Sequence, residues 1–344
     1  LTPNTAGGGG LFTEGGPVTI TGSTFTDNTA TEEGGGISID NFGTFLMTDT
    51  LIKNNRAGAD GGGLENSGMR VIFERLTGQD NRAGIHGGGI MNSSSGPFTI
   101  EDSTIQRNNA LSGGGLANLP DNDLFVRRTL ILGNVARTPG LTESGEPEDG
   151  GLGGGFYSMA DGDAKFENST ISGNKAAKGG GGLFHDADGE VRLESNTIWR
   201  NSAPQGGAIG VVESDFVPEN PPQPNRALIA RNNVIGGSLE GGTCDWYITS
   251  EGGNIDGGGL REEPEIPLEI LLPTRTACFL NQPATSNDKP KDGRDRAGNA
   301  KLDAIADNGG PTLTHRLLRE SLAVDNGVAP CPDPDQRGIE RPQH

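Results

Sequence analysis

The stretch Gly113-Gly114-Gly115-Leu116 decides the fold, because the same pattern returns along the chain at a nearly fixed interval. Glycine-rich runs closed by one apolar residue end at eight positions: Leu11, Ile37, Leu64, Ile90, Leu116, Phe156, Leu183 and Ile209. The steps between them are 26, 27, 26, 26, 40, 27 and 26 residues, and removing the 14 residues of 137–150 from the long step restores 26. Eight marks in phase indicate an internal repeat with one insertion rather than low-complexity sequence.

Two further tracks keep phase with the glycine runs. One is a short alternating apolar run, such as Val71-Ile72-Phe73. The other has the form apolar-x-x-Asn, as in FTDN, LIKN, IQRN, ISGN and IWRN, which end at Asn28, Asn54, Asn108, Asn174 and Asn201. Each period therefore holds three short segments with two-residue alternation, divided by Gly, Asn and Asp. This periodicity is typical of strands and not of helices.

Three short strands per period predict an all-β fold, a three-sheet parallel β-solenoid with coils of about 26 residues. One period would form one coil, and about eight to nine coils would stack at about 4.8 Å each. The Asn that ends the third strand is expected to bond the backbone of a turn and the Asn of neighbouring coils, as an amide ladder. The glycine runs would supply positive φ angles or close backbone approach at a corner.

The composition agrees with a thin core shared by many similar units. Of the 344 residues 58 are glycine, hydrophobic residues make up 31%, and the net charge is 27 − 46 = −19. No apolar run approaches the ~18 residues that a membrane-spanning helix needs. A chain this acidic, without a basic block, is not drawn to the phosphates of nucleic acids. We therefore expect no transmembrane segment and no nucleic-acid partner.

The pairing of GG[GA][IL] with [FIL]xxN resembles the repeat of chlamydial polymorphic outer-membrane proteins and related bacterial surface β-helices. The resemblance covers about residues 4 to 236. It implies a right-handed parallel β-helix on the surface of a bacterium or outside the cell. We accordingly expect residues 1–236 to form the repeat domain, with residues 137–150 as an inserted loop.

The last third of the chain is similar to the C-terminal region of bacterial choice-of-anchor Q surface proteins. The similarity covers about residues 225 to 342 and rests on the words DNGGPT at 307–312 and DQRG at 335–338. Proteins of that group carry variable surface-attachment signals further on, whereas this sequence ends two residues after Pro342. We expect residues 237–344 to continue the solenoid and to cap it, because a solenoid end leaves a sheet edge and an open core to cover.

The three cysteines lack the CxxC spacing of a zinc site. A disulfide between Cys244 and Cys278 would close a loop inside the irregular region and leave Cys331 as the odd thiol, although other pairings stay open. Such a bond suits an oxidising, extracellular compartment.

Acidic clusters follow several glycine corners at comparable phases, so stacked loops could bring their carboxylates together. Calcium binds several such oxygens. The calcium candidates are Asp121, Asp123, Asp161, Asp163, Asp186 and Asp188. The alternative is that Asp and Gly simply make turns here. No cofactor is required by the sequence, and Ca²⁺ is the one ion that it suggests.

No catalytic residue can be assigned from the sequence. The histidines are scattered, and no P-loop, GxSxG or HExxH motif is present. We predict a non-enzymatic structural or adhesive β-helix. The alternatives are a polysaccharide lyase or hydrolase, with three or more carboxylates and an Arg along one sheet, and a calcium-dependent carbohydrate-binding module. Extracellular polysaccharide or a host surface would then be the partner.

The beginning of the sequence matches the interior of a repeat, since Asn4-Thr5-Ala6 before GGGG parallels Asn28-Thr29-Ala30 before GGG. Either an N-terminal part is missing, or something else covers the first coil. We expect that the end of the next molecule could do so, because an open sheet edge is a template for another chain. Repeated head to tail, this contact would build a homo-oligomer or an extracellular filament.

Overall fold

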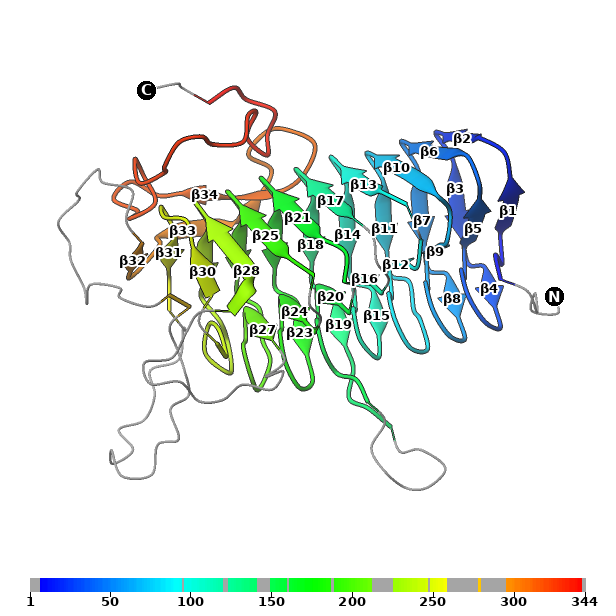
Figure 1. Cartoon of the computed structure of the whole chain (residues 1–344), viewed down its shortest axis with the longest axis horizontal. Helices are drawn as coiled ribbons and strands as arrows, with labels where there is room; N and C mark the ends of the chain where they lie inside the picture. The colour runs from blue at the N-terminus through cyan, green and yellow to red at the C-terminus, as the bar shows by residue number, and fades with distance from the viewer. Residues whose placement is uncertain are drawn as a thin grey trace.

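Successive coils stack along one axis into a parallel β-helix, which Figure 1 shows from the side. The computed structural model describes residues 7–94, 96–119, 123–140, 149–159, 161–186, 189–211, 225–246, 248–258, 278–279 and 295–341. Strands one period apart pair in parallel, as Leu64 with Ile90 and Ile90 with Leu116 do. The predicted fold class is thereby confirmed.

Three long sheets run the length of the rod in the part of the chain that the structure describes, and their strands are counted within those residues. The first sheet has eight strands: β1 (Leu11–Gly15), β5 (Ile37–Asn41), β9 (Leu64–Asn66), β12 (Ile90–Asn92), β16 (Leu116–Asn118), β20 (Phe156–Ser158), β24 (Leu183–His185) and β27 (Ile209–Val211). The second has nine: β2 (Val18–Thr21), β6 (Thr44–Thr48), β10 (Arg70–Glu74), β13 (Phe98–Glu101), β17 (Leu124–Arg127), β21 (Ala164–Glu167), β25 (Val191–Glu194), β28 (Asn225–Arg231) and β30 (Ile248–Ser250). The third has ten: β3 (Thr24–Thr26), β7 (Leu51–Lys53), β11 (Thr77–Gln79), β14 (Thr104–Gln106), β18 (Leu130–Leu132), β22 (Thr170–Ser172), β26 (Thr197–Trp199), β29 (Val234–Gly236), β31 (Ile255–Asp256) and β32 (Arg296–Ala297).

Short strands complete the coils. Two-residue strands follow the third sheet in several coils: β4 (Thr29–Ala30), β8 (Arg56–Ala57), β15 (Asn109–Ala110), β19 (Val135–Ala136) and β23 (Lys175–Ala176). An antiparallel pair, β33 (Leu302–Ala306) and β34 (Thr314–Leu317), lies near the C-terminus. Among the described residues, no helix has the length and apolarity to cross a membrane.

The core is a stack of like side chains between the sheets. Phe45, Phe73 and Phe98 come from neighbouring strands of the second sheet, and each is fully buried. Their rings meet edge to face, with centroids 6.3 and 5.0 Å apart. Such contacts add to the burial energy of large apolar side chains. The two-residue alternation in the sequence therefore places one apolar side chain above another, coil after coil.

A left-handed glycine explains why each coil carries a glycine run. Gly153 has φ +62°, and a Cβ there would lie 2.3 Å from the carbonyl oxygen of Phe156 and 2.7 Å from Cβ of Tyr157. Gly180 meets Leu183 and Phe184 in the same way, at 2.3 and 2.7 Å. The chain turns so tightly into the first sheet that no side chain fits at this position.

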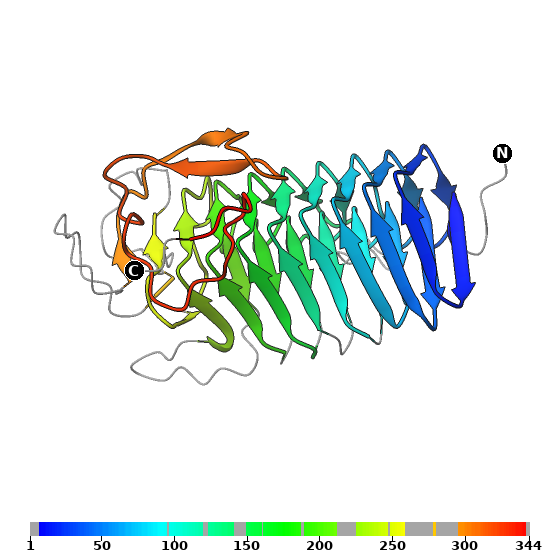
Figure 2. The same cartoon turned by 90° about the horizontal axis from the view of Figure 1, so that it is seen from above.

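The C-terminal residues fold back along the rod, as Figure 2 shows from above. The β33–β34 pair and its flanks pack against the outer face of the third sheet, where Trp199, Val234, Ile255 and Ala300 form a second small hydrophobic cluster. We call residues 325–341 the C-terminal strap, because this segment runs along the corner between the second and third sheets. Hydrogen bonds from Asn168 to Pro334 and from Asn232 to Val328 fix it there.

Candidate functional site

An unbroken column of asparagines lines the corner after the third sheet. Its members are Asn28, Asn55, Asn81, Asn108, Asn134, Asn174 and Asn201. Nδ2 of Asn108 donates to Oδ1 of Asn134 at 3.0 Å and to the carbonyl oxygen of Gly78 at 3.0 Å. The backbone N–H of Asn108 donates to the same Oδ1 at 2.9 Å. Each rung thus satisfies a turn and ties it to the next coil.

The assignment of Asn54 to this column is wrong, since Asn55 is the rung. The aligned motif is Ile52-Lys53-Asn54-Asn55, in which Ile52 takes the inward position opposite Phe25. Asn54 instead stands at the exposed left-handed turn, with φ +54°, and hydrogen-bonds Asp27. Two further rungs are Asn81 and Asn134. Asn81 lacks the motif, because Gly78 stands at the apolar position, whereas Ile131-Leu132-Gly133-Asn134 fits it in full.

Cys244 and Cys278 form a disulfide, and both residues are fully buried. The backbone N–H of Cys278 donates to Oδ2 of Asp256 at 2.8 Å, which ties the bridge to strand β31. Cys331 is a free thiol on the C-terminal strap and contacts Asn232 at 3.4 Å.

The calcium candidates do not gather into one group where the structure describes them. Asp121 and Asp188 lie outside the described residues. For the described candidates, Asp123, Asp161, Asp163 and Asp186, no set of three or more His, Cys, Asp or Glu side chains in the described ranges could hold a metal. Oδ1 of Asp163 accepts a hydrogen bond from the backbone of Glu190 at 3.0 Å, the role of a turn residue. Calcium binding stays a prediction.

A row of titratable side chains lies on the outer face of the first sheet. Glu65 is only 3% exposed, and its two carboxylate oxygens accept hydrogen bonds from Ser38 at 3.0 Å and Ser93 at 2.5 Å. Burial, together with the charge of Glu33, raises the pKa of Glu65 to about 7, although the serine hydrogen bonds oppose this shift. Glu65 therefore gains or loses a proton near neutral pH.

Asp60 and His86 lie in the corner that leads into the first sheet, whereas Tyr157 lies on strand β20 of that sheet. Oδ1 of Asp60 lies 3.1 Å from Nδ1 of His86 and accepts the backbone N–H of His86 at 2.8 Å. The His86 ring stacks on Tyr157 at a centroid distance of 6.0 Å, above the small side chain of Ala117 in the strand between them. A carboxylate that holds Nδ1 presents Nε2 as a base, which is a geometry used for proton transfer.

The outer face of the second sheet carries paired charges. Glu194, whose side chain is 7% exposed, contacts Arg231 at 2.9 Å, Lys165 at 3.2 Å and Arg192 at 3.9 Å. The same cations also pair with Glu167, Glu190 and Glu251. The face thus has the carboxylates and arginines expected of a polysaccharide-cleaving sheet. Each of these carboxylates is joined to a cation, so the array also serves to link β21, β25 and β28.

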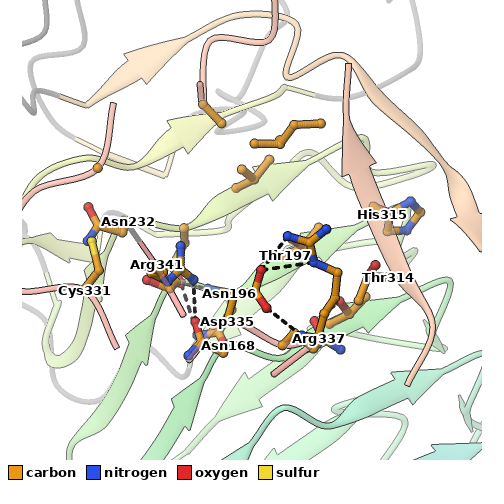
Figure 3. Close-up of a pocket in the computed structure, with 18 of the residues that line it drawn as sticks. Asn168, Asn196, Thr197, Asn232, Thr314, His315, Cys331, Asp335, Arg337 and Arg341 are labelled. Carbon is orange, nitrogen blue, oxygen red and sulfur yellow. Dashed lines mark hydrogen bonds and ion pairs between the residues drawn. The ribbon is translucent and has the colours of Figure 1, made fainter. Parts of the chain in front are cut away.

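A cavity of about 650 Å³ lies where the C-terminal region crosses the rod, and Figure 3 shows its lining. The third sheet contributes Thr170, Thr197 and Val234 to it, and the corner before that sheet contributes Asn168, Ser195 and Asn232. Strand β34 and the C-terminal strap form the other walls, with His315, Asp335, Arg337 and Arg341 among their residues. Ligand sites of proteins have volumes in this range.

The polar walls of the cavity are held by specific bonds. Arg341 donates to Oδ1 of Asn168 at 2.6 Å, and Arg337 donates from Nε and Nη2 to Oδ2 of Asp335 at 3.0 and 2.6 Å. Burial raises the pKa of Asp335, but these hydrogen bonds outweigh it and lower the pKa overall. Ser172 bonds Nε2 of His315 at 3.0 Å, and burial lowers the pKa of His315, which disfavours the charged form of its ring.

The sequence carries some of this arrangement, although only once the coil is known. Ser38, Glu65, Tyr157 and Phe184 each follow the apolar residue that closes a glycine run, so they share one column. The corner column reads Asp49, Arg75, Asp102 and Arg128 in the coils before the strap, with the ion pairs Asp49–Arg75 and Asp102–Arg128 between neighbouring coils. Along the strap it reads Asn168, Ser195 and Asn232. The change from charged to neutral residues marks where the strap lies.

The comparisons with known proteins bear on the solenoid. The model of a family described as the right handed beta helix region matches residues 9–217. No curated protein and no solved structure matches the chain. The matched residues cover the eight glycine runs of the repeat, apart from Gly7 and Gly8 at the start of the first run.

Proposed function

This chain belongs to the right-handed beta-helix family, and we propose that it is a non-enzymatic structural and adhesive element that acts outside the cell or on its surface. Membership of this family is consistent with surface and extracellular proteins. A rod of in-register sheets gives length and stiffness without a deep catalytic cleft. Its net charge of −19 keeps such a rod soluble.

The observation that carries the proposal is the buried disulfide between Cys244 and Cys278. Disulfides persist in oxidising compartments and are rare in the bacterial cytosol. It lies at the end of the rod where the regular repeat gives way to the C-terminal region. The similarity of this region to choice-of-anchor Q proteins, and of the repeats to polymorphic outer-membrane proteins, supports the same placement.

The test is to locate the native protein by cell fractionation and surface proteolysis, and to read the thiol state of Cys244 and Cys278 by alkylation and mass spectrometry. We expect an oxidised pair in the surface or secreted fraction. Beads coated with the folded protein should then adhere to polysaccharide or cell surfaces, whereas beads coated with unfolded protein should not. A cytosolic protein with both thiols reduced would refute the proposal.

We further propose, as more specific parts of this function, that the protein assembles head to tail and that it binds calcium. Electron microscopy of the native material tests the first, since filaments with an axial repeat of one molecule are expected. Thermal melting in EDTA tests the second, and an unchanged melting temperature would count against a structural calcium ion.

A second candidate function is cleavage of polysaccharides, favoured by the Asp60–His86 pair beside Tyr157 and by Glu65 on the first sheet. A base and a proton-bearing carboxyl are what elimination or hydrolysis of a glycosidic bond requires. A panel of acidic and neutral polysaccharides, assayed for new reducing ends and for unsaturated products, tests it. Any activity should disappear in His86→Ala and persist in Glu32→Gln, which changes an exposed carboxylate two coils away.

A further inference from the structure

We propose that the cavity between the C-terminal region and the third sheet binds one anionic sugar residue, carboxylated or sulfated, as the terminal unit of a glycan. The inference deepens the adhesive function proposed above, and its biological use rests on that function. The binding itself is a property of the cavity and is testable on the isolated full chain.

The lining is less negative than the rest of the protein. Arg316 is already paired with Asp303 at 2.7 Å, which leaves Arg337 and Arg341 beside Asp325 and Asp335, so the charges of the lining balance. The whole chain carries −19. Arg200 adds to this region, since its charge is among the causes that lower the pKa of His315. A locally neutral region with arginines, in a chain this acidic, is a place where an anionic ligand meets the least repulsion.

Some polar groups of the lining have donors or acceptors that make no hydrogen bond to the described part of the protein. Oγ of Ser195 is buried and has no hydrogen-bond partner within the described part of the chain. The Thr197 hydroxyl has no partner there either, and Arg337 bonds Asp335 through Nε and Nη2 only, so Nη1 has no bond in these ranges. Buried polar groups are normally satisfied, so the Ser195 hydroxyl marks a place where a ligand or water belongs. Arg337, whose side chain is 40% exposed, has its free Nη1 at the open side of the cavity.

The volume and the apolar part of the lining distinguish a sugar from a simple ion. About 650 Å³ exceeds the needs of sulfate or acetate and has room for a sugar residue. Val234 and Ala323 supply apolar surface for a ring, while Thr197 and Ser195 face its hydroxyls. Arg337 is placed for the acidic group, because a guanidinium recognises carboxylates and sulfates alike.

Calorimetric titration of the full chain tests the proposal with glucuronic acid, a sulfated hexose, glucose, acetate and inorganic sulfate. We expect binding of at least one of the two anionic sugars, about tenfold or more tighter than glucose and than either small anion. Binding of the uronate alone identifies a carboxylated unit, and binding of the sulfated sugar alone identifies a sulfated one. Equal binding of glucose, equal binding of the small anions, or no binding of any probe overturns the inference.

Two variants tie the binding to the cavity. Arg337→Gln should weaken anionic sugars by about tenfold or more, and Thr197→Val, which keeps the shape of the side chain, should weaken them severalfold. The matched controls are Arg107→Gln, from a similar Arg–Asp pair at another corner, and Thr104→Val, from the same column of the third sheet in a bare coil. Unchanged affinity in both cavity variants refutes the site. Bead adhesion that survives Arg337→Gln would separate this failure from that of the adhesive function.

Discussion

At the residue scale, one asparagine per coil governs the turn after the third sheet. Asn55 is 1% exposed, accepts hydrogen bonds from the backbone and side chain of Asn28, and donates to Phe25 and Asn81. Removing it leaves several buried backbone and amide groups without partners, and each costs about 1–3 kcal/mol. The adjacent Asn54 has no comparable part, because its side chain is exposed.

We therefore predict that Asn55→Ala lowers the free energy of unfolding by about 2–4 kcal/mol in urea titration. Asn54→Gly is the control, since glycine tolerates the φ of +54° at that turn, and it should change stability by less than about 0.5 kcal/mol. Equal losses of unfolding free energy in the two variants would show that the asparagine column does not stabilise the turn.

Glu65 predicts a dependence of stability on pH. Its pKa of about 7 in the folded protein lies above the ordinary value of 4.5, so the folded state binds the proton more tightly. The stabilisation is complete below pH 4.5 and is lost as the pH rises through 7, a loss of about 3 kcal/mol. Unfolding titrations from acidic to mildly alkaline pH should show this fall in the wild type.

Glu65→Gln should remove most of that fall, because the amide stays neutral and keeps hydrogen-bonding to Ser38 and Ser93. Glu32→Gln, at an exposed position, should leave the pH profile as it is. A free energy of unfolding of the wild type that stays constant from pH 4.5 to above pH 7 would contradict the raised pKa of Glu65.

At the scale of the element, the corner into the first sheet and the middle of strand β11 give glycine opposite roles. Gly153 has φ +62° and backbone atoms within 2.3 Å of any added Cβ. Gly78 interrupts the inward column between Ile52 and Ile105, and a Cβ there would meet nothing within 4 Å. The same residue type is obligatory in one place and leaves unfilled space in the other.

Gly153→Ala should therefore destabilise the protein by about 3 kcal/mol or more, through overlap and a disfavoured backbone conformation. Gly78→Ala should stabilise it by about 0.5–1 kcal/mol, because alanine restricts the unfolded chain and fills space. Thermal melts of both variants test these two predictions. A higher melting temperature for Gly153→Ala would contradict the steric argument at this corner.

The sheets could be predicted from the sequence because the glycine runs and the alternating apolar residues recur in every coil. The sites depend on residues that occur once and do not recur. The fixed phase of the glycine runs averages over eight coils, so the stack was predictable even though single strands have three residues. Asn54 was misplaced by one position because two asparagines stand together and the motif alone does not say which faces inward. The cavity could not be predicted, since its walls come from residues more than a hundred positions apart, such as Asn168 and Arg341.

At the scale of the whole molecule, the disulfide closes a loop at the end of the rod, and both of its cysteines belong to the hydrophobic core of the solenoid. Cys244 and Cys278 are 34 residues apart, and the loss of chain entropy on closing such a loop corresponds to about 4 kcal/mol in the unfolded state. We predict that the Cys244→Ala/Cys278→Ala double variant melts at a clearly lower temperature. Cys331→Ser, which removes only the free thiol, should melt close to the wild type, and equal effects would argue against the bridge.

The C-terminal strap is expected to be held mainly at two corners. Asn168 accepts from Arg341 and donates to Pro334, and Asn232 exchanges hydrogen bonds with Val328. Asn168→Gly keeps the left-handed turn, whose φ is +47°, but deletes the contacts. Hydrogen exchange of the backbone amides in 335–341 should become faster, while that of the first-sheet strands stays slow. No change in the strap would show that other contacts hold it.

The strap also determines how the rod would behave under tension. The hydrogen bonds between coils lie along the rod axis, so pulling on the two ends peels the coils apart one after another, as a zipper opens. The C-terminal region spans that direction (Figure 2) and is bonded to Arg128, Asn168 and Asn232 in different coils. It works as a splint across these interfaces. Coils that the C-terminal region does not contact should separate first. The N-terminal end of the rod would then lengthen under tension while the C-terminal end keeps its structure.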